Sequence, residues 1–379
     1  MRHPSISPAC CAWPFTDTGM PAPGDDPCPL PAAIPTNSAE TDNYESVSQC
    51  PESSRYVELK RLVCRERLLQ KRPGYYCLRI LLNLGLLFCG MVLVMVTRNS
   101  WLLVCDAMFL AFVFTQMGFI VHDAGHFQIF RQRWKNDLVG ILHANLTLGF
   151  SYTRWITTHN RHHAHPNRLG KDPDMDFSVL AFTKDQALEK NGVCHWIVHR
   201  QAYLFFPLLL LEAVNLKADC IRFLLREKVH YRIVELICLV VHFSLYFGFL
   251  LHFLTVSQTT LFIVVQQAAF GLYLGLAIAP NHIGMPVLEH HTELDFLIRQ
   301  ALTTRNLRRH WLTDYCYGPL SCQIEHHLFP TIPLSGLRKA QAIVRPYFEA
   351  HGIPYHEAGP LESYREIFHF LNAVSATLG

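Results

Sequence analysis

The residues of this sequence best suited to chemistry are histidines that lie in three short clusters. Within residues 159–163 the histidines stand at positions i, i+3 and i+4, which places three imidazoles on one face of a helix. The cluster before it is an i, i+4 pair, and the cluster after it is an adjacent pair. If the clusters meet in space, they form a nitrogen-rich site for transition-metal ions. The seven histidines are His122, His126, His159, His162, His163, His326 and His327.

An eighth histidine, His282, follows a long apolar run and can join the same site. Eight neutral imidazoles could supply four or fewer nitrogens to each of two metal ions, which leaves room for oxygen, water or a bridging ligand. The lack of thiolates and the scarcity of carboxylates argue against an iron-sulfur cluster or a structural zinc site. Asp123 and Glu325 lie beside candidate ligands and could accept the distal N–H of a histidine. The competing interpretation of each is a solvated carboxylate at the membrane surface.

The composition is typical of a membrane protein. Hydrophobic residues make up 50% of the chain, charged residues only 17%, and the mean hydropathy is +0.15. The net charge of +3, without a basic run interleaved with aromatics, argues against nucleic acid as a partner. The 13 cysteines contain no C-x-x-C pair, so we expect no disulfide framework and a reducing, cytosolic compartment.

Four apolar runs have the length of about 20 residues that a helix needs to cross a bilayer. They are residues 77–96, 101–121, 233–254 and 260–279. Basic residues are concentrated in 55–72 and 217–232, and the positive-inside rule places both segments in the cytosol. Four crossings then put both termini and all the clustered histidines on the cytosolic side. Three or five crossings would have divided the histidines across the membrane.

The remaining segments complete a predicted all-α integral membrane fold. Two apolar runs, 138–150 and 203–214, are too short to cross and return, so we expect interfacial or re-entrant helices there. Residues 122–232 and 281–379 form a cytosolic helical cap that holds the metal site. Residues 1–55 are rich in Pro, Ser, Thr, Asp and Ala, without apolar periodicity, and predict a disordered extension before a membrane domain at 56–379.

The clusters resemble the three histidine boxes of the membrane fatty acid desaturases. They read His122-Asp123-Ala124-Gly125-His126, His159-Asn160-Arg161-His162-His163 and Gln323-Ile324-Glu325-His326-His327-Leu328-Phe329-Pro330. A third box that begins with Gln is similar to the branch of front-end desaturases and bacterial acyl-CoA or acyl-lipid desaturases. Thr304-Arg305-Asn306 and Asn281-His282 also resemble that branch. The resemblance covers residues 56–355.

The resemblance implies a di-iron enzyme that uses O2 and two external electrons to place a cis double bond in an acyl chain. The substrate would be an acyl-CoA or an acyl-lipid. The seven box histidines match iron ligands of the family, and His282 matches an extra ligand outside the boxes. Gln323 is expected to act beside the ligands as a donor, although its carbonyl could also bind iron, and Asn281 is expected to support the same site.

One family feature is missing from this sequence. Many front-end desaturases contain a fused cytochrome b5 domain with a His-Pro-Gly-Gly motif, which does not occur here. We therefore expect a separate ferredoxin, cytochrome b5 or flavin reductase to supply electrons, docking on the basic surface near Arg61 and Arg226. Membrane topology and lipid headgroups alone would also account for those basic residues.

Two other functions remain open from the sequence. A lipid hydroxylase on the same scaffold would share the first hydrogen abstraction and differ only afterwards. A histidine-rich membrane metal-binding protein would be expected to hold ionisable ligands near the middle of its spans, whereas these clusters lie at helix exits.

An alternating acidic segment completes the candidate sites. Asp172, Asp174 and Asp176 are spaced as in a calcium loop, but Phe177 stands where an EF-hand requires glycine. We therefore predict that this segment is a solvated loop.

Overall fold

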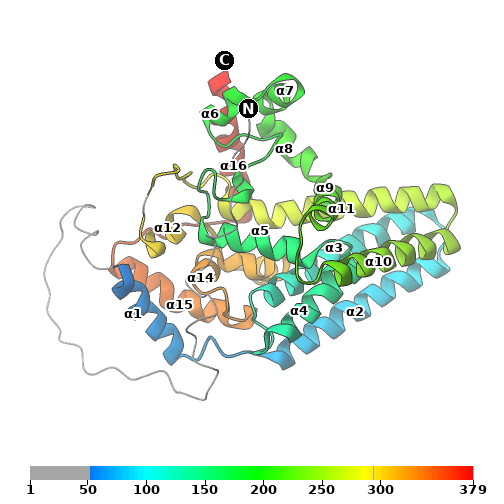
Figure 1. Ribbon diagram of the computed structural model, residues 1–379, viewed down its shortest axis with the longest axis horizontal. Coiled ribbons are helices and arrows are strands. Elements are labelled where there is room, and N and C mark those ends of the chain that lie inside the picture. Colours follow the sequence, from blue (N-terminus) through cyan, green and yellow to red (C-terminus); the bar gives the residue numbers. More distant parts are fainter. Residues whose placement is uncertain (1–51, 293, 379) are drawn as a thin grey trace, which may run out of the picture. The chain divides into compact units, whose positions relative to one another are not determined.

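Four helices in the computed structural model, which describes residues 52–292 and 294–378, are long and apolar enough to cross a membrane. They are α2 (Pro73–Val96), α3 (Ser100–Gly125), α10 (Arg232–Phe253) and α11 (Val256–His282). They extend side by side in Figure 1. Each predicted span falls on one of them, so the four-span all-α prediction is confirmed.

Local sequence signals explain where the spans begin. The side chain of Asn99 caps α3 by accepting hydrogen bonds from the amides of Trp101 and Leu102. Thr255 and Gln258 form a capping box at the start of α11. The Gln258 amide also donates to the Arg98 carbonyl at 3.0 Å, which joins the two turns at the end of the bundle farthest from the histidines.

Helix α3 is the central span of the bundle. In its most apolar stretch 67% of the residues are buried, against 17% in α2 and 22% in α10. α2 and α10 instead expose large apolar side chains such as Leu81, Phe88 and Val240, as expected of helices that face lipid. α3 and α11 run in the same direction, and both end at a histidine-bearing turn.

The two predicted interfacial segments fall on pairs of shorter helices. Residues 138–150 overlap α4 (Arg133–Ile141) and the π-helix η2 (Leu142–Leu148). Residues 203–214 overlap α8 (Gln201–Leu209) and α9 (Glu212–Arg226). The interfacial location of these helices stays a prediction.

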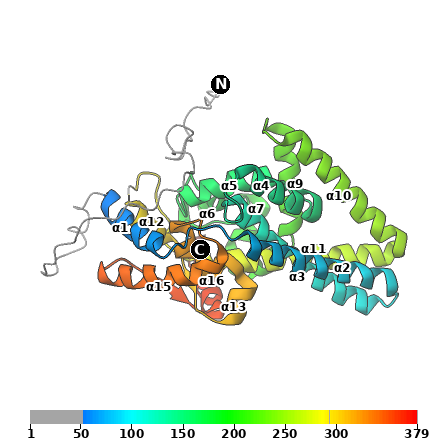
Figure 2. The same cartoon turned by 90° about the horizontal axis from the view of Figure 1, so that it is seen from below.

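The other helices form a cap at the end of the bundle where the histidines lie. They include α1 (Glu52–Arg65), α5 (Tyr152–Ala164), α6 (Lys184–Glu189), α7 (Gly192–His199), α12 (Phe296–Thr303), α13 (Trp311–Tyr317), α14 (Gln323–Leu328), α15 (Leu334–Ala350) and α16 (Pro360–Ser375). The 3-10 turns are η3 (Pro173–Met175), η4 (Gly318–Cys322) and η5 (Ala376–Leu378). Figure 2 shows α1, α12 and α15 at one end of the molecule and the four spans at the other.

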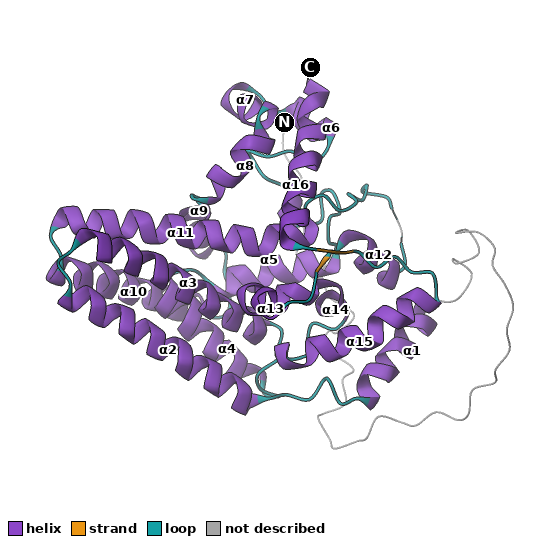
Figure 3. Ribbon diagram, turned by 180° about the vertical axis from the view of Figure 1, so that it is seen from behind, coloured by secondary structure: helices purple, strands orange, loops and turns teal. Residues whose placement is uncertain are grey.

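The only strands in the described chain are two residues long. β1 (Asn306–Leu307) pairs in parallel with β2 (Glu357–Ala358), which Figure 3 shows in orange within the helical cap. Apolar side chains such as Leu59, Ile324 and Phe348 pack between α1, α14 and α15 as one core cluster. Most of the predicted N-terminal extension, residues 1–51, lies outside the described residues, whereas residues 52–55 open α1.

Candidate metal centre

Four helices bring the predicted ligands to the junction between the spans and the cap. α3 holds His122 in its last turn and ends at its C-cap, His126. α5 carries the cluster of residues 159–163 on its last turns, and α11 ends at His282. The short buried helix α14 supplies the remaining adjacent pair. Residues separated by up to 205 positions therefore share one site.

The eight histidines form two groups, and in each group the ligand atoms lie within 4.8 Å of one another. The first group contains His122, His126, His159, His163 and His326, and the second contains His162, His282 and His327. Within the first group, Nε2 of His159 is 2.9 Å from Nε2 of His126 and 3.0 Å from that of His163. In the second, the Nε2 atoms of His162 and His282 are 3.2 Å apart. The nitrogens thus converge on two centres, divided five and three, whereas the sequence predicted four or fewer at each centre.

The chemistry of this donor set fits metal ions. Nε2 of His122 and Nε2 of His327 are buried and have no hydrogen-bond partner among the described residues. An unpaired buried polar atom costs about 1–3 kcal/mol, and a bound metal would remove that cost. Burial, together with neighbouring imidazoles, also holds the pKa of His126, His159, His163, His326 and His327 well below the usual value. These five histidines are therefore neutral, which is the form that binds metal.

Comparison with known proteins identifies the family. A family model described as "Fatty acid desaturase" matches residues 99–359, a range that contains all eight histidines. The chain belongs to the fatty acid desaturase family.

Curated desaturases from three distant organisms match most of this chain. An acyl-lipid (9-3)-desaturase of Physcomitrium patens is 28% identical over 325 residues, which is 83% of this chain and 62% of the relative. A Delta(8)-fatty-acid desaturase of Euglena gracilis is 31% identical over 79% of this chain and 73% of its own length. A Delta(5) fatty acid desaturase of Caenorhabditis elegans is 27% identical over 79% and 69%, respectively. This chain thus spans less than two thirds of the length of the Physcomitrium patens relative.

In this family member, an acidic residue that was not predicted as a partner of His162 orients the His162 ring. The predicted solvated loop is wrong for Asp172, which is buried, although Asp174 and Asp176 are exposed. Asp172 accepts from Nδ1 of His162 at 2.9 Å. Burial alone would lower the pKa of His162, but the Asp172 charge more than reverses this and raises it to about 9. The contact fixes the tautomer, so Nε2 of His162 faces His282.

Other histidines of the two groups are oriented in the same way. Nδ1 of His122 donates to the Asp123 carboxylate at 3.1 Å, which is the arrangement expected for Asp123. Nδ1 of His327 lies 2.9 Å from the Gln300 side-chain oxygen. Nδ1 of His282 lies 3.0 Å from the Thr303 carbonyl. Sequence patterns did not single out Gln300 or Thr303, because α12 carries no histidine and becomes a neighbour only through the fold.

Glu325 contacts different groups from those predicted. Its buried carboxylate accepts from the Asn306 side chain and the Tyr355 hydroxyl, each at 2.8 Å. Adjacent residues of a helix point in different directions, so Glu325 faces β1 while His326 faces the metal site. Glu325 therefore anchors α14 to β1 instead of accepting from a histidine.

The other two predicted supporting residues differ in how close they come to the histidines. Nε2 of Gln323 is 3.0 Å from Nε2 of His282, and Oε1 of Gln323 is buried without a partner among the described residues. A rotated amide would present that oxygen to the three-histidine group. Asn281 instead donates to the carbonyls of Arg305 at 3.0 Å and Leu320 at 2.7 Å, so it fixes the backbone around the site.

An aromatic wall supports the five-histidine group. The Trp155 ring stacks on His159 with a centroid distance of 4.5 Å and an interplanar angle of 22°. A Cβ atom at Gly125 would lie 2.6 Å from this indole, so only glycine allows the ring so close to α3. Gly125 lies between His122 and His126, the predicted ligands of the first box, so packing against Trp155 also restricts the residue type within this box.

Proposed function

We propose that this chain is a membrane-bound, oxygen-dependent acyl desaturase with two irons held by its eight histidines. The observation that carries the proposal is the convergence of separate histidine clusters into two nitrogen-lined groups at the ends of α3 and α11. The family match and the names of the curated relatives support desaturation as the reaction. Their names also favour it over hydroxylation.

The residues of each group have defined tasks in this proposal. One iron would be held by the five-histidine group and the other by the three-histidine group, with Gln323 beside the second. Bound iron would supply the oxygen activation needed to remove hydrogens from neighbouring methylenes of an acyl chain. Asp123, Asp172 and Gln300 accept the outer N–H groups, which turns the opposite ring nitrogens inward. The buried site keeps bulk water away from the reacting atoms.

The proposed orientation places the cap, both termini and the metal centre in the cytosol. Basic residues gather on the cap side of the spans, in α1 and α9, as the positive-inside rule requires. The histidine groups lie at span ends, which favours a surface-facing enzyme over a metal transporter with ligands near the membrane centre. An external redox protein is proposed to deliver the two electrons to this face.

Expression in a host with a compatible reductase tests this function. Mass spectrometry of fatty acid methyl esters should show a new double bond in cells that express the unaltered chain. The bond should be missing when His163, a member of the five-histidine group, is replaced by Ala. Unchanged lipids, despite bound iron and an active electron donor, would overturn the proposal. Hydroxylated esters instead would assign the same scaffold to hydroxylation.

A further inference from the structure

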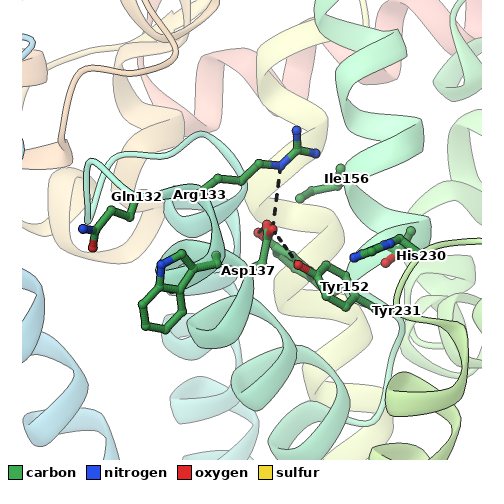
Figure 4. Close-up of a pocket in the computed structure, with 9 residues that line it drawn as sticks. Gln132, Arg133, Asp137, Tyr152, Ile156, His230 and Tyr231 are labelled. Atoms are coloured by element: carbon green, nitrogen blue, oxygen red, sulfur yellow. Dashed lines mark hydrogen bonds and ion pairs between the residues drawn. The ribbon is translucent and has the colours of Figure 1, made fainter. Parts of the chain in front are cut away.

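A pocket of about 630 Å³ lies between α4, α5 and the residues that precede α10 (Figure 4). Its wall combines one carboxylate, one guanidinium, an imidazole and three large aromatic side chains. These are Asp137, Arg133, His230, Trp134, Tyr152 and Tyr231. The eight predicted ligands do not line it, so it is a separate feature that requires its own explanation.

The carboxylate of Asp137 is the buried charge of this pocket. Its two oxygens lie 3.3 Å from the hydroxyls of Tyr152 and Tyr231, respectively. Burial and the Asp137 charge raise the pKa of Tyr152, so that hydroxyl stays protonated and donates. An anion held among aromatic rings is the complement of an ammonium group, which binds both carboxylates and ring faces.

The rim of the pocket suits an anion. Arg133 and His230 are exposed, and the Arg133 Nε atom lies 3.7 Å from the Asp137 carboxylate, which leaves its other N–H groups available. The formal charges of Arg133 and Asp137 cancel. A polyanion such as CoA needs several unpaired basic side chains, whereas a balanced pair suits a zwitterion.

The pocket lies at the level where a membrane span begins, and one of its lining residues packs against the α3 turn that carries predicted ligands. Tyr231 directly precedes α10, so the pocket lies at the level where this span begins, and Trp134 and Leu138 of α4 are exposed nearby. Its inner wall includes Ile156. A Cβ atom at Gly125 would be 3.2 Å from the Ile156 side chain, so Ile156 packs directly against the turn of α3 that carries the first ligands.

We propose that this pocket binds the zwitterionic headgroup of a phospholipid whose acyl chain is the substrate. The ammonium would lie against Asp137 and the aromatic rings, and the phosphate against Arg133 and His230. The proposal rests on the desaturase function and deepens it, because it assigns a membrane phospholipid, and not acyl-CoA, as the carrier of the acyl chain.

Binding measured without turnover tests the headgroup site. The full chain, purified with iron in an uncharged detergent, is titrated calorimetrically with water-soluble dibutyrylphosphatidylcholine. Dibutyrylphosphatidylglycerol, which lacks the ammonium, and CoA are titrated in parallel. We expect the choline lipid to bind at least about tenfold more tightly than either, the size of one charge-assisted contact.

Variants connect the binding to the pocket. Asp137→Asn should weaken choline-lipid binding about tenfold, because the amide cannot neutralise the ammonium. Asp185→Asn makes the same change on exposed α6 and should leave binding unaltered. Trp134→Ala provides a second test, since the exposed Trp134 side chain contributes little to folding. We expect it to weaken binding as well.

The experiments distinguish failure of the headgroup site from failure of the desaturase function. Equal binding of the two lipids, tighter binding of CoA, or unchanged affinity in both pocket variants would overturn the headgroup site even if the chain desaturates lipids. Selective choline-lipid binding without any new double bond in cells would support the headgroup site and contradict the proposed desaturase function.

Discussion

The hydroxyl of Ser151 donates a 2.5 Å hydrogen bond to the carboxylate of Glu235, which joins the cap to the membrane-spanning helix α10. Ser151 is the N-cap of α5, and its oxygen also accepts from the Arg154 amide. Glu235 further accepts from the Thr153 amide and from the Asn145 side chain, each at 3.0 Å. A buried carboxylate at the N-terminus of α5 thus fixes the helix that carries three of the predicted ligands.

Replacing Glu235 by Ala should loosen the box-two helix. The side chains of Asn145 and Ser151 would lose their acceptor in a buried site, and each unpaired group costs about 1–3 kcal/mol. We expect a lower unfolding temperature and less iron per chain. Glu235→Gln, which keeps one oxygen acceptor, should retain more iron than Glu235→Ala. An Ala variant with unaltered iron content and unfolding temperature would show that the contact does not position α5.

Gly125 should tolerate no side chain. Its Cβ would meet the Trp155 ring at 2.6 Å and displace the indole that stacks on His159. Because displacements of about 1 Å near reacting groups can cost about a hundredfold in rate, Gly125→Ala should lose at least tenfold in desaturation. Gly118 is the matched control on the same helix, with nothing within 4 Å of its Cβ position.

The control variant Gly118→Ala should not lose activity. Gly118→Ala should keep its activity and gain up to about 1 kcal/mol of stability from better helix propensity. Product formation and thermal unfolding of both variants are the measurements. Similar activity in the two variants would mean that the Trp155 contact does not set the position of His159.

Iron bound by the three-histidine group should be lost without loss of the iron bound by the five-histidine group. His327→Ala removes one of the three ligands and should lower the iron content from about two to about one per chain, with loss of turnover. His291→Ala, in an exposed loop, should change neither quantity. Elemental analysis of the purified proteins measures the ratio. Loss of both irons together would instead indicate one cooperative centre.

Lys217 should give stability a pH dependence. Its ammonium donates to the Gln267 side chain at 2.7 Å, and burial lowers the pKa of Lys217 to about 8. An unfolded lysine has a pKa of about 10.4, so between these values the unfolded chain binds more protons and stability rises with pH.

The corresponding measurement compares the chain with Lys217→Met. Between about pH 8 and about pH 10, the unfolding temperature of the unaltered chain should rise relative to that of the variant. Below about pH 8 the difference should level off, because Lys217 is then protonated in both states. Parallel profiles over the whole range would rule out a titration of Lys217.

Local patterns were sufficient to predict the spans and the helical face that the histidines of the second box share. Helical spacing within residues 159–163 predicted three imidazoles on one face, and α5 is a helix. Apolar length located all four spans, although α3 and α11 continue beyond the predicted ends to include His122 and His282. A polar ligand lowers the hydropathy of the last turn, so hydropathy alone ended those helices too early.

The hydrogen-bond partners of the clustered histidines could not be predicted because they depend on tertiary contacts. Asp172 follows His162 by ten positions in a loop, and its acidic neighbours made it resemble a solvated segment. Gln300 reaches His327 only because α12 packs against α14. Sequence adjacency suggested Glu325 either as an acceptor from a histidine or as a solvated carboxylate, yet its position on the helix turns it towards Tyr355.

Anomalous diffraction at the iron absorption edge tests the central claim most directly. The account predicts two peaks in each chain. One should lie at coordination distance from imidazole nitrogens of the five-histidine group and the other at coordination distance from those of His162, His282 and His327. A single peak, or iron bound away from these imidazoles, would contradict it.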